Sequence, residues 1–173
     1  GFVFLKDRTD LVKKSAIYIL QHCGYILMYS AFTDLKFCRR ISYGFFHAIV
    51  NPGDEVIVLA PYFPEYKPYA ELTGATFKVV PPDVPDFQIR LEAVEAAITE
   101  HTVAIIINSP NNPSGVVYSR QTLEKLAAIL EEKSAAYGHP IYLISDEPYR
   151  EITYGKKVPY LPHLYPDTVI CYS

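Results

Sequence analysis

Short runs of apolar residues recur along most of the chain, and they constrain its fold more than any other feature. Four of them, residues 56–59, 103–107, 141–144 and 168–171, are apolar almost throughout. Runs of this kind are typical of strands that are buried on both faces of a parallel sheet. A fifth run, residues 76–80, contains a lysine and is expected closer to an edge of the sheet.

Helical patterns lie between the predicted strands. The apolar positions of the first are Leu91, Val94 and Ile98, and those of the second are Leu123, Leu126, Ala127 and Leu130. Ser119 is a plausible N-cap for the second helix, and Gly138 followed by Pro140 is a stop signal. Strands that alternate with helices through short connections predict an α/β fold, in which helices flank a mostly parallel sheet.

The first 50 residues differ in composition from the rest. All 14 prolines and every glutamate lie after Val50, and residues 1–50 carry seven basic residues against three aspartates. An apolar stretch at 16–32 is interrupted by Gln21 and His22, so it is at the lower limit for a membrane span. We therefore expect no membrane segment.

The charge and the cysteine content limit which partners and which cellular compartment the sequence suggests. The net charge of −3 and the pI near 5.9 argue against a nucleic-acid binder, which usually carries a basic excess. Three cysteines without a C-x-x-C spacing favour reduced thiols. A cytoplasmic protein is expected on this basis.

Polar and aromatic residues follow the predicted strands at the edge where parallel α/β sheets bind ligands. They are Phe63, Asn112, Asp146, Tyr149 and Ser173. Each has a simpler interpretation: the proline-rich segments can be packed turns, and Asp146 with Glu147 can be a helix cap or a metal pair. With no histidine nearby in sequence, no metal site is expected.

Four segments carry a resemblance to a known family. They are N-P-G-D-E at 51–55, P-Y-F-P-E-Y at 61–66, N-S-P-N-N-P-S-G at 108–115 and S-D-E-P-Y at 145–149. In this order and spacing they resemble the pyridoxal-phosphate-dependent aminotransferases of class I/II, the aspartate-aminotransferase-like enzymes of fold type I. The resemblance implies that residues 46–173 are the central part of the large, cofactor-binding domain, and that the enzyme is a homodimer.

The resemblance also implies roles for the residues at the strand ends. Phe63 corresponds to the aromatic that stacks on the pyridine ring, and Asp146 to the carboxylate that pairs with the ring nitrogen. Asn112 and Tyr149 correspond to the amide and the phenol that share the cofactor's phenolic oxygen. Ser173 corresponds to a hydroxyl that contacts the phosphate.

Two departures from the family pattern qualify this interpretation. The lysine that forms the Schiff base is expected three residues beyond Ser173, so no catalytic residue is assigned and this chain alone is expected to be inactive. The glycine-rich turn for the phosphate would fall at 37–41, where the sequence is Phe-Cys-Arg-Arg-Ile. Residues 1–45 are therefore left unassigned, with the hypothesis that they are not family sequence.

Three functions stay open at this point. The first is transamination between an amino acid and a 2-oxo acid in the parent enzyme, with pyridoxal 5'-phosphate as cofactor. The second is a catalytically inactive fragment or a non-functional gene product. The third is lyase or synthase chemistry on the same cofactor and fold.

Overall fold

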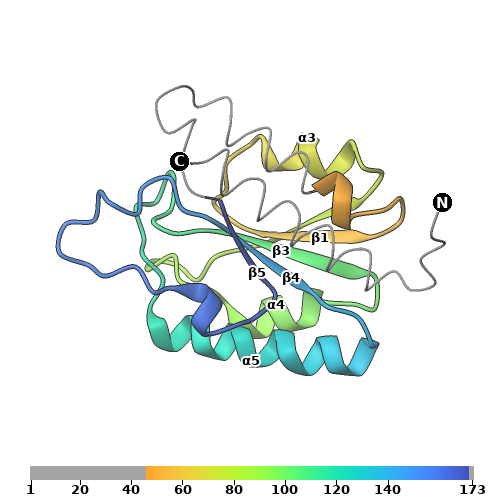
Figure 1. The fold of residues 1–173 in the computed structure, drawn as a ribbon. Helices are drawn as coiled ribbons and strands as arrows, with labels where there is room; N and C mark the ends of the chain where they lie inside the picture. Colours follow the sequence, from red (N-terminus) through yellow and green to blue (C-terminus); the bar gives the residue numbers. More distant parts are fainter. Residues whose placement is uncertain (1–45, 172–173) are drawn as a thin grey trace, which may run out of the picture.

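A computed structural model describes residues 46–171. Within this range, five strands form one parallel sheet in the order β2-β1-β3-β4-β5 (Figure 1). The strands are β1 (Glu55–Leu59), β2 (Thr76–Val80), β3 (Thr102–Asn108), β4 (Tyr142–Asp146) and β5 (Thr168–Cys171). The prediction of a parallel α/β sheet is confirmed, including the edge position of β2.

Helices cover both faces of the sheet, so its strands are buried from two sides. Residues 46–49 and α3 (Tyr66–Glu71) lie on one face, and α4 (Leu91–Ala97) and α5 (Arg120–Tyr137) lie on the other (Figure 1). Alternate residues of β1 separate accordingly: Ile57 packs in the core under α4 and α5, and Val58 packs in the core under α3. This burial on both faces is the reason that the middle residues of the central strands are mostly apolar.

The end signals of α5 are confirmed. The Ser119 hydroxyl accepts a hydrogen bond from the Thr122 backbone N–H at 3.0 Å. Gly138 ends the helix at φ 75°, a left-handed conformation that glycine adopts without steric cost.

The first helical pattern predicts a helix that is one residue too long. Ile98 is not part of α4, because its backbone is extended at ψ 129°. Its side chain is nevertheless only 5% exposed and joins the same core as Val94. The chain turns there to enter β3, and the turn is fixed by a hydrogen bond from the Thr99 N–H to the Thr102 hydroxyl at 2.9 Å.

None of the helices within residues 46–171 is long and apolar enough to cross a membrane. The apolar stretch at 16–32 and the segment at 37–41 lie outside the described residues, as does Ser173.

A cluster at the start of β1 gives a first testable prediction. The Glu55 carboxylate is 2.7 Å from Lys78 Nζ and accepts hydrogen bonds from the hydroxyls of Thr99 and Thr102. Burial alone would raise the pKa of Glu55, but these bonds outweigh it and hold the pKa below its ordinary value. Lys78→Met is expected to lower the free energy of unfolding by about 1 kcal/mol at pH 7. Urea unfolding measures this loss.

The sign of the pH dependence provides a check on that prediction. The pKa of Glu55 is lowered in the folded protein. The stabilisation that the charged carboxylate contributes is therefore present above the ordinary value of 4.5 and is lost as the pH falls through the lowered pKa. The difference between wild type and Lys78→Met should therefore shrink in acid. Lys67→Met is a matched control, because Lys67 and Glu71 are 3.8 Å apart with both side chains more than half exposed. Equal losses in the two variants would contradict the prediction.

Candidate functional site

The candidate site lies where β3 and β4 end side by side. Asn108, the last residue of β3, is in register with Asp146, the last residue of β4. Asn108 Nδ2 donates to the Asp146 backbone carbonyl at 2.8 Å, and Asn108 Oδ1 accepts from the Asn112 backbone N–H at 2.7 Å. This one side chain thus fixes the loop after β3 against the end of β4.

A second asparagine anchors the same loop on its other side. Asn111 is 4% exposed, and its Nδ2 donates to the Pro61 carbonyl at 2.9 Å. Its Oδ1 accepts from the backbone N–H and the hydroxyl of Ser114, at 3.0 and 2.7 Å. The positioning by Asn108 and Asn111 was not predicted. The sequence contains three asparagines around Pro110, but their spacing does not reveal which of them hold the loop.

The loop presents Asn112 to Tyr149. Asn112 Nδ2 lies 3.5 Å from the Tyr149 hydroxyl, at the outer limit of a hydrogen bond. Both residues line a pocket of about 450 Å³ between the loop at 110–117 and the loop at 149–156. This volume is within the range of small-molecule sites, but Phe63 and Asp146 are not among the residues that line the pocket.

Asp146 is partly buried and is held by a neutral donor. The Tyr66 hydroxyl, at the start of α3, donates to Asp146 Oδ2. Burial raises the pKa of the Asp146 carboxyl, the Tyr66 bond lowers it and the neighbouring Glu147 raises it, so that the pKa lies above its ordinary value. Among residues 46–171, no salt bridge reaches Asp146 from a lysine or arginine.

Phe63 lies next to this pair, in the turn between β1 and α3. Its ring centroid is 5.7 Å from that of Tyr66, and the two planes meet at 72°. The structure thus connects Phe63 through Tyr66 to Asp146, and brings Asn112 to Tyr149. The roles assigned to these four residues stay predictions, and Ser173 is outside the described range.

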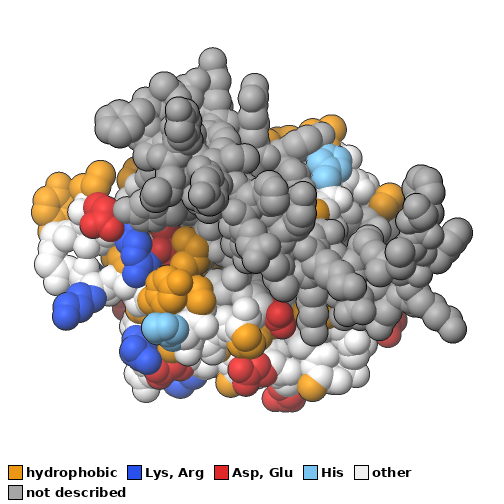
Figure 2. Space-filling model, viewed as in Figure 1, with side chains coloured by type: hydrophobic (Ala, Val, Ile, Leu, Met, Phe, Trp, Pro, Cys, Tyr) orange, Lys and Arg blue, Asp and Glu red, His pale blue; other side chains and the backbone are white. Residues whose placement is uncertain are grey.

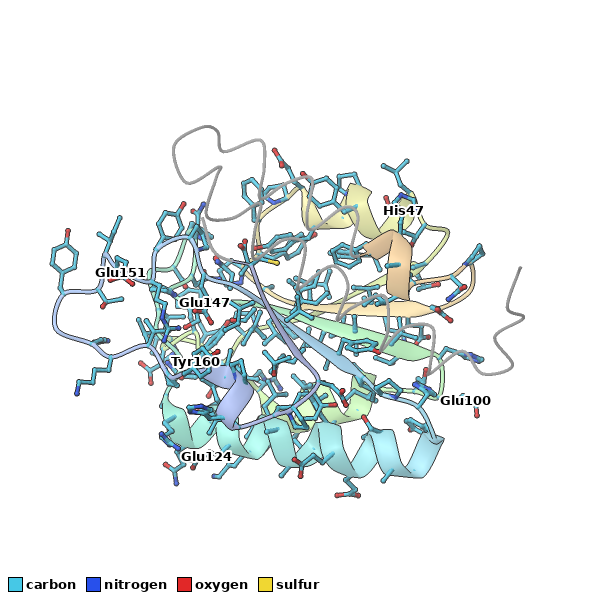
Figure 3. The ribbon with its side chains drawn as sticks, viewed as in Figure 1. His47, Glu100, Glu124, Glu147, Glu151 and Tyr160 are labelled. Atoms are coloured by element: carbon cyan, nitrogen blue, oxygen red, sulfur yellow. The ribbon has the colours of Figure 1, made fainter. Side chains whose placement is uncertain are left out.

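Glu147 faces away from Asp146 toward different partners, although the two are adjacent in sequence. Its side chain is 0% exposed, accepts a hydrogen bond from the Ser145 hydroxyl at 2.7 Å and forms an ion pair with Arg150. The described part of the chain contains no group of three or more residues that could hold a metal ion. Figure 3 shows Glu147 close to the sheet, whereas Glu151 lies out on the loop that projects from it.

The donor set of the site matches what pyridoxal phosphate requires. A protonated pyridine nitrogen needs an anion beside it, and Asp146 can supply one. Burial disfavours the charged form of this carboxyl, and a cationic ring nitrogen favours it. The phenolic oxygen needs hydrogen-bond donors, and the Asn112 amide and the Tyr149 hydroxyl can both donate. An aromatic ring at Phe63 offers a stacking face. The chemistry of these side chains is therefore suited to the ring of the cofactor, and their roles toward it stay predictions.

Comparison with known proteins gives the following results. The family model described as aminotransferase class I and II matches residues 38–173. Aspartate aminotransferase from Thermotoga maritima is 42% identical over 117 residues, which are 67% of this chain and 29% of that protein. Among solved structures, an amino transferase from Eubacterium rectale is 49% identical with a TM-score of 0.74, covering 79% of this chain and 34% of that one. A variant of Thermus thermophilus aspartate aminotransferase is 34% identical with a TM-score of 0.70, covering 78% of this chain and 36% of that one. The chain thus spans about a third or less of the length of the relatives it matches.

Proposed function

The chain belongs to the family of class I and II aminotransferases, and we propose that the full-length protein transfers an amino group from an amino acid to a 2-oxo acid with pyridoxal 5'-phosphate as cofactor. The observation that carries this proposal is the Asp146 carboxylate, which is partly buried at the end of β4 with a neutral phenol as its donor. Such a carboxylate is suited to a cationic ring nitrogen. The family match favours transamination over lyase or synthase chemistry.

When bound, the cofactor supplies an electron-withdrawing ring that stabilises negative charge on the substrate carbon. Each residue of the site has a task toward that ring. Asp146 favours the protonated ring nitrogen by its charge. Phe63 excludes water from one face of the ring, and Asn112 and Tyr149 orient it through its phenolic oxygen.

The loop at 108–117 keeps these groups in place. Because Asn108 binds both the Asp146 backbone carbonyl and the Asn112 backbone N–H, it ties together the two backbone segments that carry the carboxylate and the amide. A site held in this way loses little entropy when it orients a ligand. We also propose that Ser173 contacts the phosphate, that the protein is a homodimer, and that it is cytoplasmic.

The experiment uses the purified full-length protein with pyridoxal phosphate. It is incubated with a panel of amino acids, beginning with aspartate, and a 2-oxo acid acceptor. We expect a stoichiometric visible absorbance from bound cofactor and the appearance of the aminated acceptor, followed by chromatography. Cofactor binding with elimination or decarboxylation products instead of amino transfer would contradict the proposal, as would no binding at all.

A further inference from the structure

Tyr66 touches two of the residues that are proposed to hold the cofactor ring, Phe63 and Asp146. It is the first residue of α3 and is 6% exposed. Its ring packs edge-to-face against Phe63, and its hydroxyl donates to Asp146 Oδ2 from 80 positions away in the sequence. The sequence motifs assigned this residue no role.

The geometry explains what such a residue can do. An edge-to-face contact limits the tilt of the Phe63 ring, which determines the plane on which a flat ligand can stack. A hydrogen bond to one carboxylate oxygen fixes the rotation of the Asp146 side chain and favours its charged form. The same bond therefore also determines the position of the other carboxylate oxygen, Asp146 Oδ1.

We propose that Tyr66 is a positioning residue for pyridoxal phosphate: it holds the Asp146 carboxylate and the Phe63 ring in the relative orientation that the pyridine ring requires. This inference rests on the proposed function and adds a residue to it. Tyr66 would not itself contact the reacting atoms. It acts through its hydroxyl on Asp146 and through its ring on Phe63.

Tyr66 is also part of the hydrophobic core, so its two roles have to be separated. It packs in the same cluster as Phe46, Val58 and Ala70. Tyr66→Phe keeps the ring and its packing and removes only the hydroxyl. Tyr69→Phe is a matched control on the same helix. The Tyr69 hydroxyl donates to Glu65 Oε2 at 2.9 Å, so this substitution removes a similar phenol–carboxylate bond elsewhere.

The test measures the Kd of the full-length protein for two probes. One is pyridoxal phosphate, and the other is its 1-deaza analogue, in which a C–H replaces the ring nitrogen. We expect Tyr66→Phe to weaken pyridoxal phosphate binding about tenfold, the effect of removing a hydrogen bond to a charged group. The same variant should change the Kd for the deaza analogue by less than about twofold, because the analogue offers no ring nitrogen to Asp146. Tyr69→Phe should change neither Kd.

The possible outcomes are distinct. Equal weakening for both probes would overturn the proposal, because the hydroxyl would then act on the pocket as a whole. No change for either probe would overturn it as well, and a Tyr66→Phe variant that does not fold would assign the hydroxyl to the fold instead. Failure of the wild-type protein to bind pyridoxal phosphate is a different result, which contradicts the proposed function itself.

Discussion

Replacing Arg150 by methionine is expected to lower the free energy of unfolding of the full-length protein by about 3–5 kcal/mol, the effect of removing one partner of a buried ion pair. The Glu147 side chain is 0% exposed, and Arg150 is its cationic partner. Without the guanidinium, the carboxylate retains the hydroxyl of Ser145 but has lost its opposite charge. A buried charge that has lost its counter-charge destabilises the fold. Urea unfolding at pH 7 measures the loss.

Two further variants test the explanation. Arg120→Met removes an exposed ion pair, in which Arg120 Nε is 2.7 Å from Glu124 Oε1 and the two side chains are 69% and 50% exposed, respectively. This variant should therefore change the free energy of unfolding very little. The double variant Glu147→Gln with Arg150→Met removes both buried charges and should recover part of the loss. A loss for Arg150→Met no larger than that for Arg120→Met would contradict the prediction.

The same ion pair organises the loop that follows β4. Arg150 donates to the carbonyls of Val158 and Pro159, at 3.0 and 3.4 Å, so the guanidinium joins the two ends of this loop. The loop between them carries Ile152 and Tyr154, which are 65% and 98% exposed. Figure 2 shows hydrophobic side chains on the left of the molecule, where this loop projects in Figure 1. Because residues of this loop line the pocket beside Asn112, the buried pair also shapes one wall of that pocket.

The sheet could be predicted from the sequence because its signals are local. A strand buried on both faces is apolar at most of its positions, and such a run is visible without knowing its neighbours. The same holds for the ends of α5, where Ser119 and Gly138 act within a few residues of their own position. The short helices α3 and η1 (Leu161–His163) were not predicted. Both contain a proline and are too short to show a periodic pattern.

The chemistry of the site was only partly accessible from the sequence. Asp146 and Asn112 stand out because each lies at or just beyond the carboxyl end of a strand, which places them at the ligand-binding edge of the sheet. The bond from Tyr66 to Asp146 could not be predicted, since it joins residues 80 positions apart on different elements. Glu147 was equally ambiguous. Its neighbour Asp146 turns toward α3, and only the structure shows that Glu147 is paired with Arg150 instead.

The second large effect is expected at Asp146 and concerns function rather than stability. Asp146→Asn should weaken pyridoxal phosphate binding by the full-length protein about tenfold to 100-fold, since an amide carries no charge to hold a protonated ring nitrogen. It should also lower kcat/KM for transamination by about 10²–10³, as does the loss of one electrostatic group at a reacting centre. Cofactor titration and steady-state kinetics measure the two effects. Asp86→Asn, an exposed carboxylate between β2 and α4, serves as the control and should change neither.

Stability should respond to Asp146→Asn in the opposite direction. Burial raises the pKa of the Asp146 carboxyl, so the folded protein freed of cofactor carries a cost for the charged form at neutral pH. That cost is relieved as the pH falls through the raised pKa toward the ordinary value of 3.8. The neutral amide of the variant carries no such cost, so the cofactor-free variant should be at least as stable as wild type at pH 7, and its advantage should shrink in acid. If the carboxylate instead stabilised the fold, its replacement would lower the free energy of unfolding. The sign of this change therefore separates a ligand-binding role for Asp146 from a structural one.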